Sequence, residues 1–186
     1  MKRVLILIDI QNVYFEEGNY LLYQPQRAVE KAFEALEVFR GNNEPVIHVG
    51  HMFYKEDQSE SACHSREFYH RVQPQDGEYV IWKEKPSSFL NTQLAEMLEK
   101  LEAQQIVIGG MMSHMCVDTT VRACQDYGYP VILLEDACTT KALSFQGDVI
   151  EAEVVHKAFM ASLNGMFADV MTVDEWKAMP KEIRES

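Results

Sequence analysis

The chain has 186 residues, 47 % of them apolar and 25 % charged, which is typical of one globular domain with a buried core. Its formal charge of -12 argues against nucleic-acid binding, because proteins that bind phosphate backbones need clustered Lys and Arg. We therefore expect a single domain over residues 1–186 and no nucleic-acid partner.

The amino terminus does not resemble a targeting or membrane-spanning segment. The apolar run 4–8 follows Met1-Lys2-Arg3 and stops at Asp9, short of the roughly 7–15 apolar residues of a signal peptide. No run approaches the ~20 apolar residues of a membrane span. The four cysteines have no CxxC or framework spacing, which indicates reduced thiols. We expect a cytoplasmic protein without a membrane partner.

In chain order, the sequence predicts an alternation of strands and helices. Six short runs rich in Val and Ile are typical of strands buried on both faces, and apolar residues recur at helical spacing between them. The predicted elements are strand 4–8, helix 29–36, strand 46–49, strand 79–82, helix 94–101, strand 106–108, helix 117–124, strand 131–134, helix 154–159 and strand 170–173. The polar segment 52–78 has no clear period, so it is predicted to be a loop.

This alternation predicts the fold class. Right-handed crossovers place helices on both faces of a mostly parallel sheet, which gives an α/β fold, a Rossmann-like three-layer α/β/α sandwich with a six-stranded sheet. No repeat or linker-like stretch indicates a second domain. No G-x-G-x-x-G motif follows strand 4–8, so a dinucleotide site is not predicted and no cofactor is expected.

Three reactive residues stand at the carboxyl ends of predicted strands. Asp9 closes strand 4–8, Lys83 follows strand 79–82, and Gly109-Gly110 leads from strand 106–108 to Cys116. Ligands of open parallel sheets bind at this edge, so we expect the three side chains to meet there. Taken singly, each has an ordinary structural explanation: a core thiol, a turn carboxylate and a solvated lysine. Their shared edge favours one site.

The surroundings of Cys116 are typical of a nucleophile. Residues 109–116 predict a strand, a glycine-led turn and then the first turn of a helix. Unpaired N–H groups and the positive end of the helix dipole there lower the pKa of a thiol and can hold an oxyanion. A nearby Lys83 cation acts in the same direction.

Three sequence blocks resemble, in order and spacing, the signatures of the isochorismatase-like cysteine hydrolases. They are LIDIQNVYF at 7–15, WKEKPSSF at 82–89 and GMMSHMCVDTTVRA at 110–123. The resemblance spans nearly the whole chain and implies the isochorismatase-like hydrolase fold. The Ser-His-Met-Cys wording resembles the branch that contains streptothricin hydrolase-like proteins.

The resemblance implies a role for each residue of a catalytic triad. Cys116 is the nucleophile, Asp9 is the general base and proton shuttle, and Lys83 is the electrostatic partner, selected over Lys85 by its spacing to the Ser-x-Phe stretch. A cis peptide between Met111 and Met112 is implied, with the Met112 and Cys116 amides forming the oxyanion hole. Isochorismatases proper cleave a vinyl ether and generally lack the cysteine. The expected activity is therefore an amidohydrolase that acts on a C–N bond through a thioester.

Substrate identity is left open at this point, beyond a small molecule. Aromatic side chains near the three blocks are candidates for the substrate pocket, although each could equally pack in the core or at a subunit interface. The candidates are Tyr14, Phe15, Trp82, Phe89 and His114. The resemblance also implies a homodimer or a higher homo-oligomer.

Two alternative functions remain. A nicotinamidase-like amidase would hold a metal through an Asp-x-His pattern, which residues 48–52 do not reproduce, so no metal is expected. A site built from His51, Asp57, His64 or His70 is the remaining way to hold one. The second alternative is a catalytically silent binding or redox-sensing protein with a sensor thiol at Cys116.

Overall fold

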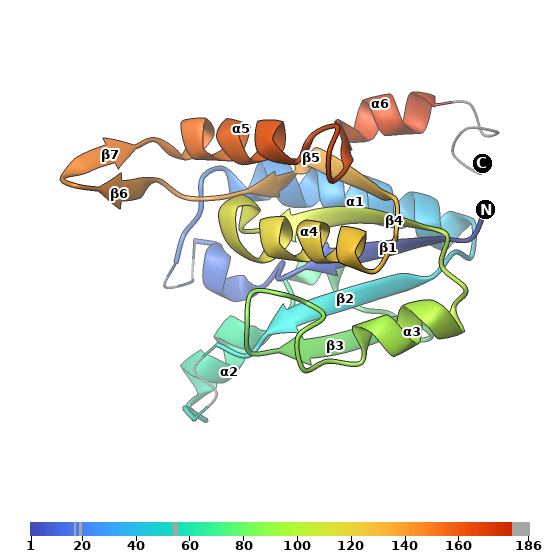
Figure 1. The fold of residues 1–186 in the computed structure, drawn as a ribbon. Helices are drawn as coiled ribbons and strands as arrows, with labels where there is room; N and C mark the ends of the chain where they lie inside the picture. Colours follow the sequence, from blue (N-terminus) through green and yellow to red (C-terminus); the bar gives the residue numbers. More distant parts are fainter. Residues whose placement is uncertain (17, 19, 54–55, 180–186) are drawn as a thin grey trace.

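The computed structural model describes residues 1–16, 18, 20–53 and 56–179. Its centre is a sheet of six parallel strands in the order β3-β2-β1-β4-β5-β8 (Figure 1). The strands are β1 (Arg3–Ile8), β2 (Val46–His51), β3 (Tyr79–Lys83), β4 (Gln105–Met111), β5 (Val131–Thr139) and β8 (Asp169–Met171). The predicted α/β fold with a six-stranded parallel sheet is confirmed.

Helices cover both faces of the sheet. On one face lie α1 (Pro25–Gly41) and α6 (Val173–Ala178), and on the other lie α3 (Leu94–Lys100), α4 (Asp118–Asp126) and α5 (Ala152–Leu163). Four of the five correspond to predicted helices. The fifth, α6, spans six residues and begins with a capping box between Thr172 and Glu175, too short a segment to show helical periodicity.

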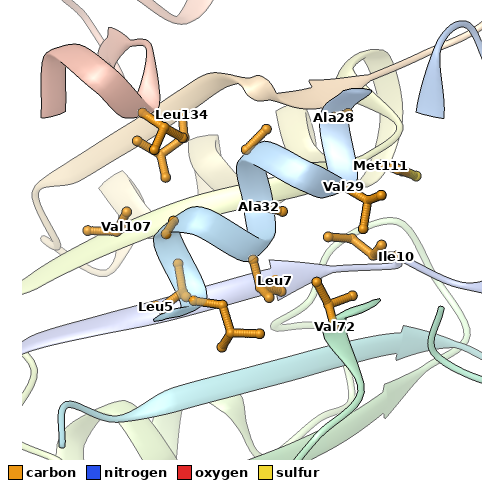
Figure 2. Close-up of a cluster of buried hydrophobic side chains, with 14 of the residues drawn as sticks. Leu5, Leu7, Ile10, Ala28, Val29, Ala32, Val72, Val107, Met111 and Leu134 are labelled. Atoms are coloured by element: carbon orange, nitrogen blue, oxygen red, sulfur yellow. The ribbon is translucent and has the colours of Figure 1, made fainter. Parts of the chain in front are cut away.

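The core consists of two apolar layers separated by the sheet. In β1, Leu5 and Leu7 face α1, as Figure 2 shows, whereas Val4, Ile6 and Ile8 pack in the opposite layer. Because both faces of the strand are buried, every position of the run is apolar rather than every second one. The same reason makes β1 recognisable from its sequence.

The segment 52–78 was predicted to be a loop, and this prediction was wrong in part. It contains α2 (Glu60–Arg66) and a short 3-10 turn, η2 (His70–Val72), while residues 54 and 55 lie outside the described residues. The Ser59 side chain caps α2 by accepting a hydrogen bond from the Ala62 amide. The buried residues of α2 are Ala62, Ser65 and Arg66, so its buried face has no apolar repeat that a sequence pattern could show.

A two-stranded hairpin was not predicted. Strands β6 (Leu143–Phe145) and β7 (Asp148–Ile150) pair antiparallel and project from the body of the molecule in Figure 1. Their side chains are largely exposed, including Phe145 at 66 % and Val149 at 63 %. In the part of the chain that the structure describes, no helix has the length and apolar character needed to cross a membrane.

Candidate active site

The carboxyl edge of the sheet brings Asp9, Lys83 and Cys116 together. Asp9 directly follows β1 and Lys83 is the last residue of β3, which lies on the far side of β2. Lys83 pairs in register with His51 at the end of β2, so its side chain extends past that strand towards Asp9. Cys116 lies in η3 (Ser113–Val117), one π-helical turn that joins β4 to α4.

The Lys83 ammonium joins the other two residues. Its Nζ atom lies 2.7 Å from Oδ2 of Asp9 and 3.1 Å from Sγ of Cys116. The side chains of Lys83 and Asp9 are both 0 % exposed, and Cys116 is 4 % exposed. A buried charge pair is stable only when its partners are in hydrogen-bond contact, and this geometry meets that condition.

Burial changes the protonation expected from the sequence. It raises the pKa of Cys116 to about 12, and the negative charge of Asp9 acts in the same direction while Lys83 opposes both. The sequence predicted a lowered pKa for this thiol, whereas burial, the largest contribution at this position, raises it. At neutral pH Cys116 is therefore a thiol, and it needs a base before it can act as a nucleophile.

Asp9 is the base within reach of that thiol. A carboxylate oxygen of Asp9 and the Cys116 sulfur lie within 4.8 Å of each other. Burial raises the pKa of Asp9 as well, with Lys83 opposing, which makes the carboxylate more ready to accept a proton. Its Oδ1 atom is buried and has no hydrogen-bond partner among the described residues.

The turn before Cys116 has the backbone features that the resemblance implies. The Met111–Met112 peptide is cis, and Met112 then precedes the first residue of η3. The element that follows is one π-helical turn, at the place where the sequence predicts the first turn of a helix. Ser113 is fully buried, and its Oγ lies 2.8 Å from Nδ1 of His156, which links this turn to α5.

Two of the predicted pocket residues belong to the turns that follow the strands of the site. Tyr14, in the 3-10 turn η1 (Asn12–Tyr14), is buried, and burial together with the charges of Asp9 and Cys116 raises the pKa of its phenol. His114 is half-buried in η3, the turn that carries Cys116, and its Nδ1 lies 2.5 Å from Oγ1 of Thr140. Burial lowers the pKa of His114, so its imidazole is neutral.

The other three predicted pocket residues lie elsewhere. Trp82 is 43 % exposed and lies against Phe68 in an open groove, because adjacent residues of a strand point to opposite faces and Lys83 faces the triad. Phe89 stacks on Tyr127, at the end of α4 that is remote from Cys116. Phe15 stacks on Tyr69 in the core.

Two residues at this site were not assigned a catalytic role from the sequence. His51 Nδ1 lies 3.0 Å from Lys83 Nζ, and the buried Gln11 side chain hydrogen-bonds to the backbone of His51. The position of His51 at the end of a strand was the available signal, since strand ends supplied the other site residues. The inward direction of Gln11 follows only from the tertiary structure.

The candidate metal ligands of the sequence do not come together. His64 pairs with Glu67, and Asp57 caps the backbone of Ser59. Among the described residues, the group with metal-ligand spacing is Asp9, His51 and Cys116. Lys83 Nζ hydrogen-bonds to all three, so its positive charge stands where a divalent ion would have to bind. With Lys83 in place, these residues do not fit a metal.

Comparisons with known proteins agree on one family. The isochorismatase domain model matches residues 3–175. The Bacillus subtilis protein YddQ, an uncharacterised isochorismatase family protein, is 40 % identical over 178 residues, which cover 94 % of this chain and 98 % of YddQ. A crystal structure of an isochorismatase from Pseudomonas putida has a TM-score of 0.88 at 35 % identity, covering 94 % of this chain and 89 % of that chain.

More distant relatives include proteins named for a reaction. The streptothricin hydrolase of Streptomyces noursei is 23 % identical over 184 residues, covering 96 % of this chain and 62 % of that protein. The ureidoacrylate amidohydrolase of Yersinia enterocolitica is 36 % identical over 66 residues, or 36 % of this chain and 29 % of that protein. At this identity the streptothricin hydrolase is a distant relative. The four residues Ser-His-Met-Cys were too few to assign this chain to its branch.

Proposed function

Because this chain belongs to the isochorismatase family, we propose that it is a cysteine-dependent hydrolase of a small-molecule amide or related C–N bond. One observation carries the proposal: the buried Lys83 ammonium hydrogen-bonds to both the Asp9 carboxylate and the Cys116 sulfur. A base, a cation and a nucleophile in contact at a strand edge are the components of acyl transfer. The name of the Yersinia relative, an amidohydrolase, supports the same reaction class.

The first half of the reaction forms a thioester. Asp9 accepts the proton of the Cys116 thiol as the sulfur attacks the carbonyl carbon, and the carbonyl oxygen becomes an oxyanion. The backbone amides of Met112 and Cys116 hold this oxyanion, and Lys83 stabilises the negative charge carried by sulfur. When the C–N bond breaks, Asp9 passes its proton to the leaving nitrogen, and an amine or ammonia departs.

The second half regenerates the enzyme. Asp9, again ionised, removes a proton from a water molecule that attacks the thioester carbonyl. The same amides hold the second oxyanion. The C–S bond then breaks, the sulfur takes the proton from Asp9, and a carboxylic acid leaves. Each proton removed by Asp9 is returned by Asp9, so no further acid or base is needed.

The burial of the nucleophile supports a small substrate. Cys116 is 4 % exposed, so a carbonyl group reaches its sulfur only after entering the interior of the site. Tyr14 lies close enough to Asp9 and Cys116 for their charges to raise the pKa of its phenol, so it is the aromatic candidate for the substrate pocket. An aromatic side chain at this position suits a planar or ring-bearing amide of small size.

The experiment is a screen for ammonia or amine release from small amides, including carboxamides, N-carbamoyl compounds and lactams. With any substrate that turns over, rapid quenching and intact-mass measurement test for an acyl group on Cys116. Cys116→Ala is expected to abolish both turnover and the adduct. Cys63→Ser is the matched control, because Cys63 lies in α2, outside the triad. We expect this variant to retain activity.

The rival function is a binding or redox-sensing protein on the same scaffold. It predicts that thiol reagents label Cys116 while no compound of the screen is hydrolysed. Turnover that persists in Cys116→Ala and Asp9→Asn would contradict the proposed mechanism outright.

A further inference from the structure

His51 is held in place from three sides. Its backbone N–H donates to Gln11 Oε1 at 2.8 Å, and its carbonyl accepts from Gln11 Nε2 at 3.0 Å. Its imidazole stacks on the ring of Phe53, with centroids 4.5 Å apart. The side chain is 20 % exposed, so it forms part of the wall of the site rather than its deepest layer. These contacts hold the imidazole in the orientation in which Nδ1 faces Lys83.

That neighbour is the Lys83 ammonium. A lysine ammonium has three N–H donors and no acceptor, and here three acceptors lie around it. Nζ is 2.7 Å from Asp9 Oδ2, 3.0 Å from His51 Nδ1 and 3.1 Å from Cys116 Sγ. The acceptor atoms lie within 4.8 Å of one another, so each N–H can be directed at a different one. The imidazole must then accept at Nδ1 and carry its proton on Nε2.

We propose that His51 is a positioning residue of this site, which accepts the third proton of the Lys83 ammonium and so holds Nζ between Asp9 and Cys116. The proposal rests on the proposed function of the triad and adds a fourth residue to it. Lys83 thereby has no free donor for the substrate, and its contribution is the placement of positive charge beside the sulfur.

The electrostatics of His51 are consistent with this role. Burial and the nearby Lys83 lower the pKa of His51 to about 4, with a further lowering from Lys85 and an opposing contribution from Glu84. The imidazole is thus neutral at pH 7 and has a lone pair to offer at Nδ1. A protonated ring could not accept from Lys83 and would add a second cation beside it.

The test compares three substitutions at position 51. In His51→Asn, the amide oxygen stands as many bonds from Cα as Nδ1 does, so the acceptor is retained. In His51→Gln the oxygen lies one bond further out, and in His51→Ala it is absent. The primary readout is the rate of Cys116 alkylation by iodoacetamide from pH 6 to pH 10, which needs no substrate. Turnover of an amide identified in the screen is the second readout.

A charge-assisted hydrogen bond of this kind changes a rate by about ten- to hundredfold. We expect His51→Ala to slow alkylation of Cys116 at pH 8 by about tenfold and to move the pH profile upward by about one unit. With a substrate, kcat falls and KM stays within about threefold. His51→Asn recovers most of the alkylation rate and most of kcat, whereas His51→Gln recovers neither.

The control is His64→Asn, which alters an exposed histidine of α2 that pairs with Glu67. Thermal melts establish that each variant is folded, and the Asn and Gln variants keep the comparison valid if the Ala variant is unstable. Equal losses in the Asn and Ala variants, or an unchanged alkylation profile in His51→Ala, would overturn the proposal. A wild-type protein that hydrolyses no amide refutes the proposed function instead, and the alkylation comparison remains decisive for His51.

Discussion

Gly110 lies so close to Ile8 that a Cβ atom at position 110 would come within 2.2 Å of the Ile8 carbonyl oxygen. The two residues pair in register on β4 and β1, and each immediately precedes part of the site: Asp9 on one strand and the Met111–Met112 peptide on the other. The short distance between these strand ends therefore also brings Asp9 close to the turn that carries Cys116.

This contact predicts a large effect for Gly110→Ala. The methyl group would force the strand ends apart, and the φ of +145° at this position is strained for any side chain. We expect a loss of unfolding free energy of more than about 3 kcal/mol in urea titrations. Gly41→Ala, where nothing lies within 4 Å, is the control and should leave stability unchanged or slightly raised. Similar stabilities of the two variants would contradict this reading.

The buried ion pair predicts that single substitutions cost more than the double one. Lys83→Met leaves the Asp9 carboxylate without its partner, and we expect a loss of about 3–5 kcal/mol of unfolding free energy. In Asp9→Asn/Lys83→Met no charge is left unpaired, so at least half of that loss should be recovered. The exposed pair Lys157–Glu153 is the control, since Lys157→Met should cost less than about 1 kcal/mol. If the double variant lost as much unfolding free energy as the two single variants together, Asp9 and Lys83 would not be energetically coupled.

The raised pKa of Cys116 predicts opposite effects of Asp9→Asn on two measurements. Because the wild-type thiol has a pKa of about 12, its alkylation rate should rise with pH up to pH 10 without a plateau. Removing the Asp9 charge lowers this pKa, so Asp9→Asn should be alkylated at least about tenfold faster at pH 8. Hydrolysis should nevertheless be lost, because the proton acceptor is gone. Slower alkylation in this variant would show that Asp9 does not raise the pKa of the thiol.

The Gln11 side chain predicts a stability loss that is larger than its size suggests. It is fully buried and hydrogen-bonds to His51 N–H, to the His51 carbonyl and to the Arg66 carbonyl. Gln11→Leu keeps the volume but leaves these backbone groups short of partners, at a cost of about 2–4 kcal/mol. Gln125→Leu, which removes one exposed bond to the Phe167 carbonyl, is the control and should cost less than about 1 kcal/mol. Equal costs would mean that Gln11 is a packing residue only.

The strands of the sheet could be predicted from the sequence because their apolar runs match their burial in the folded protein. The strands of the parallel sheet are buried on both faces, so each appears as an unbroken apolar run. The reactive residues could be placed together because parallel strands end at a common edge. The hairpin β6–β7, α2 and α6 gave no such signal. The hairpin side chains are largely exposed, α2 buries Ser65 and Arg66 rather than an apolar face, and α6 buries only Val173 and Trp176.

The sequence by itself determined the fold class, the order of Asp9, Lys83 and Cys116 along it, and their common edge of the sheet. Only the tertiary structure decided what surrounds them. It brought His51 to the ammonium and raised the pKa of Cys116 to about 12. The physical reason is that apolar periodicity is a property of neighbouring residues, whereas desolvation and hydrogen bonding depend on contacts between residues far apart in the chain. His51 and Lys83, 32 positions apart, are one such contact.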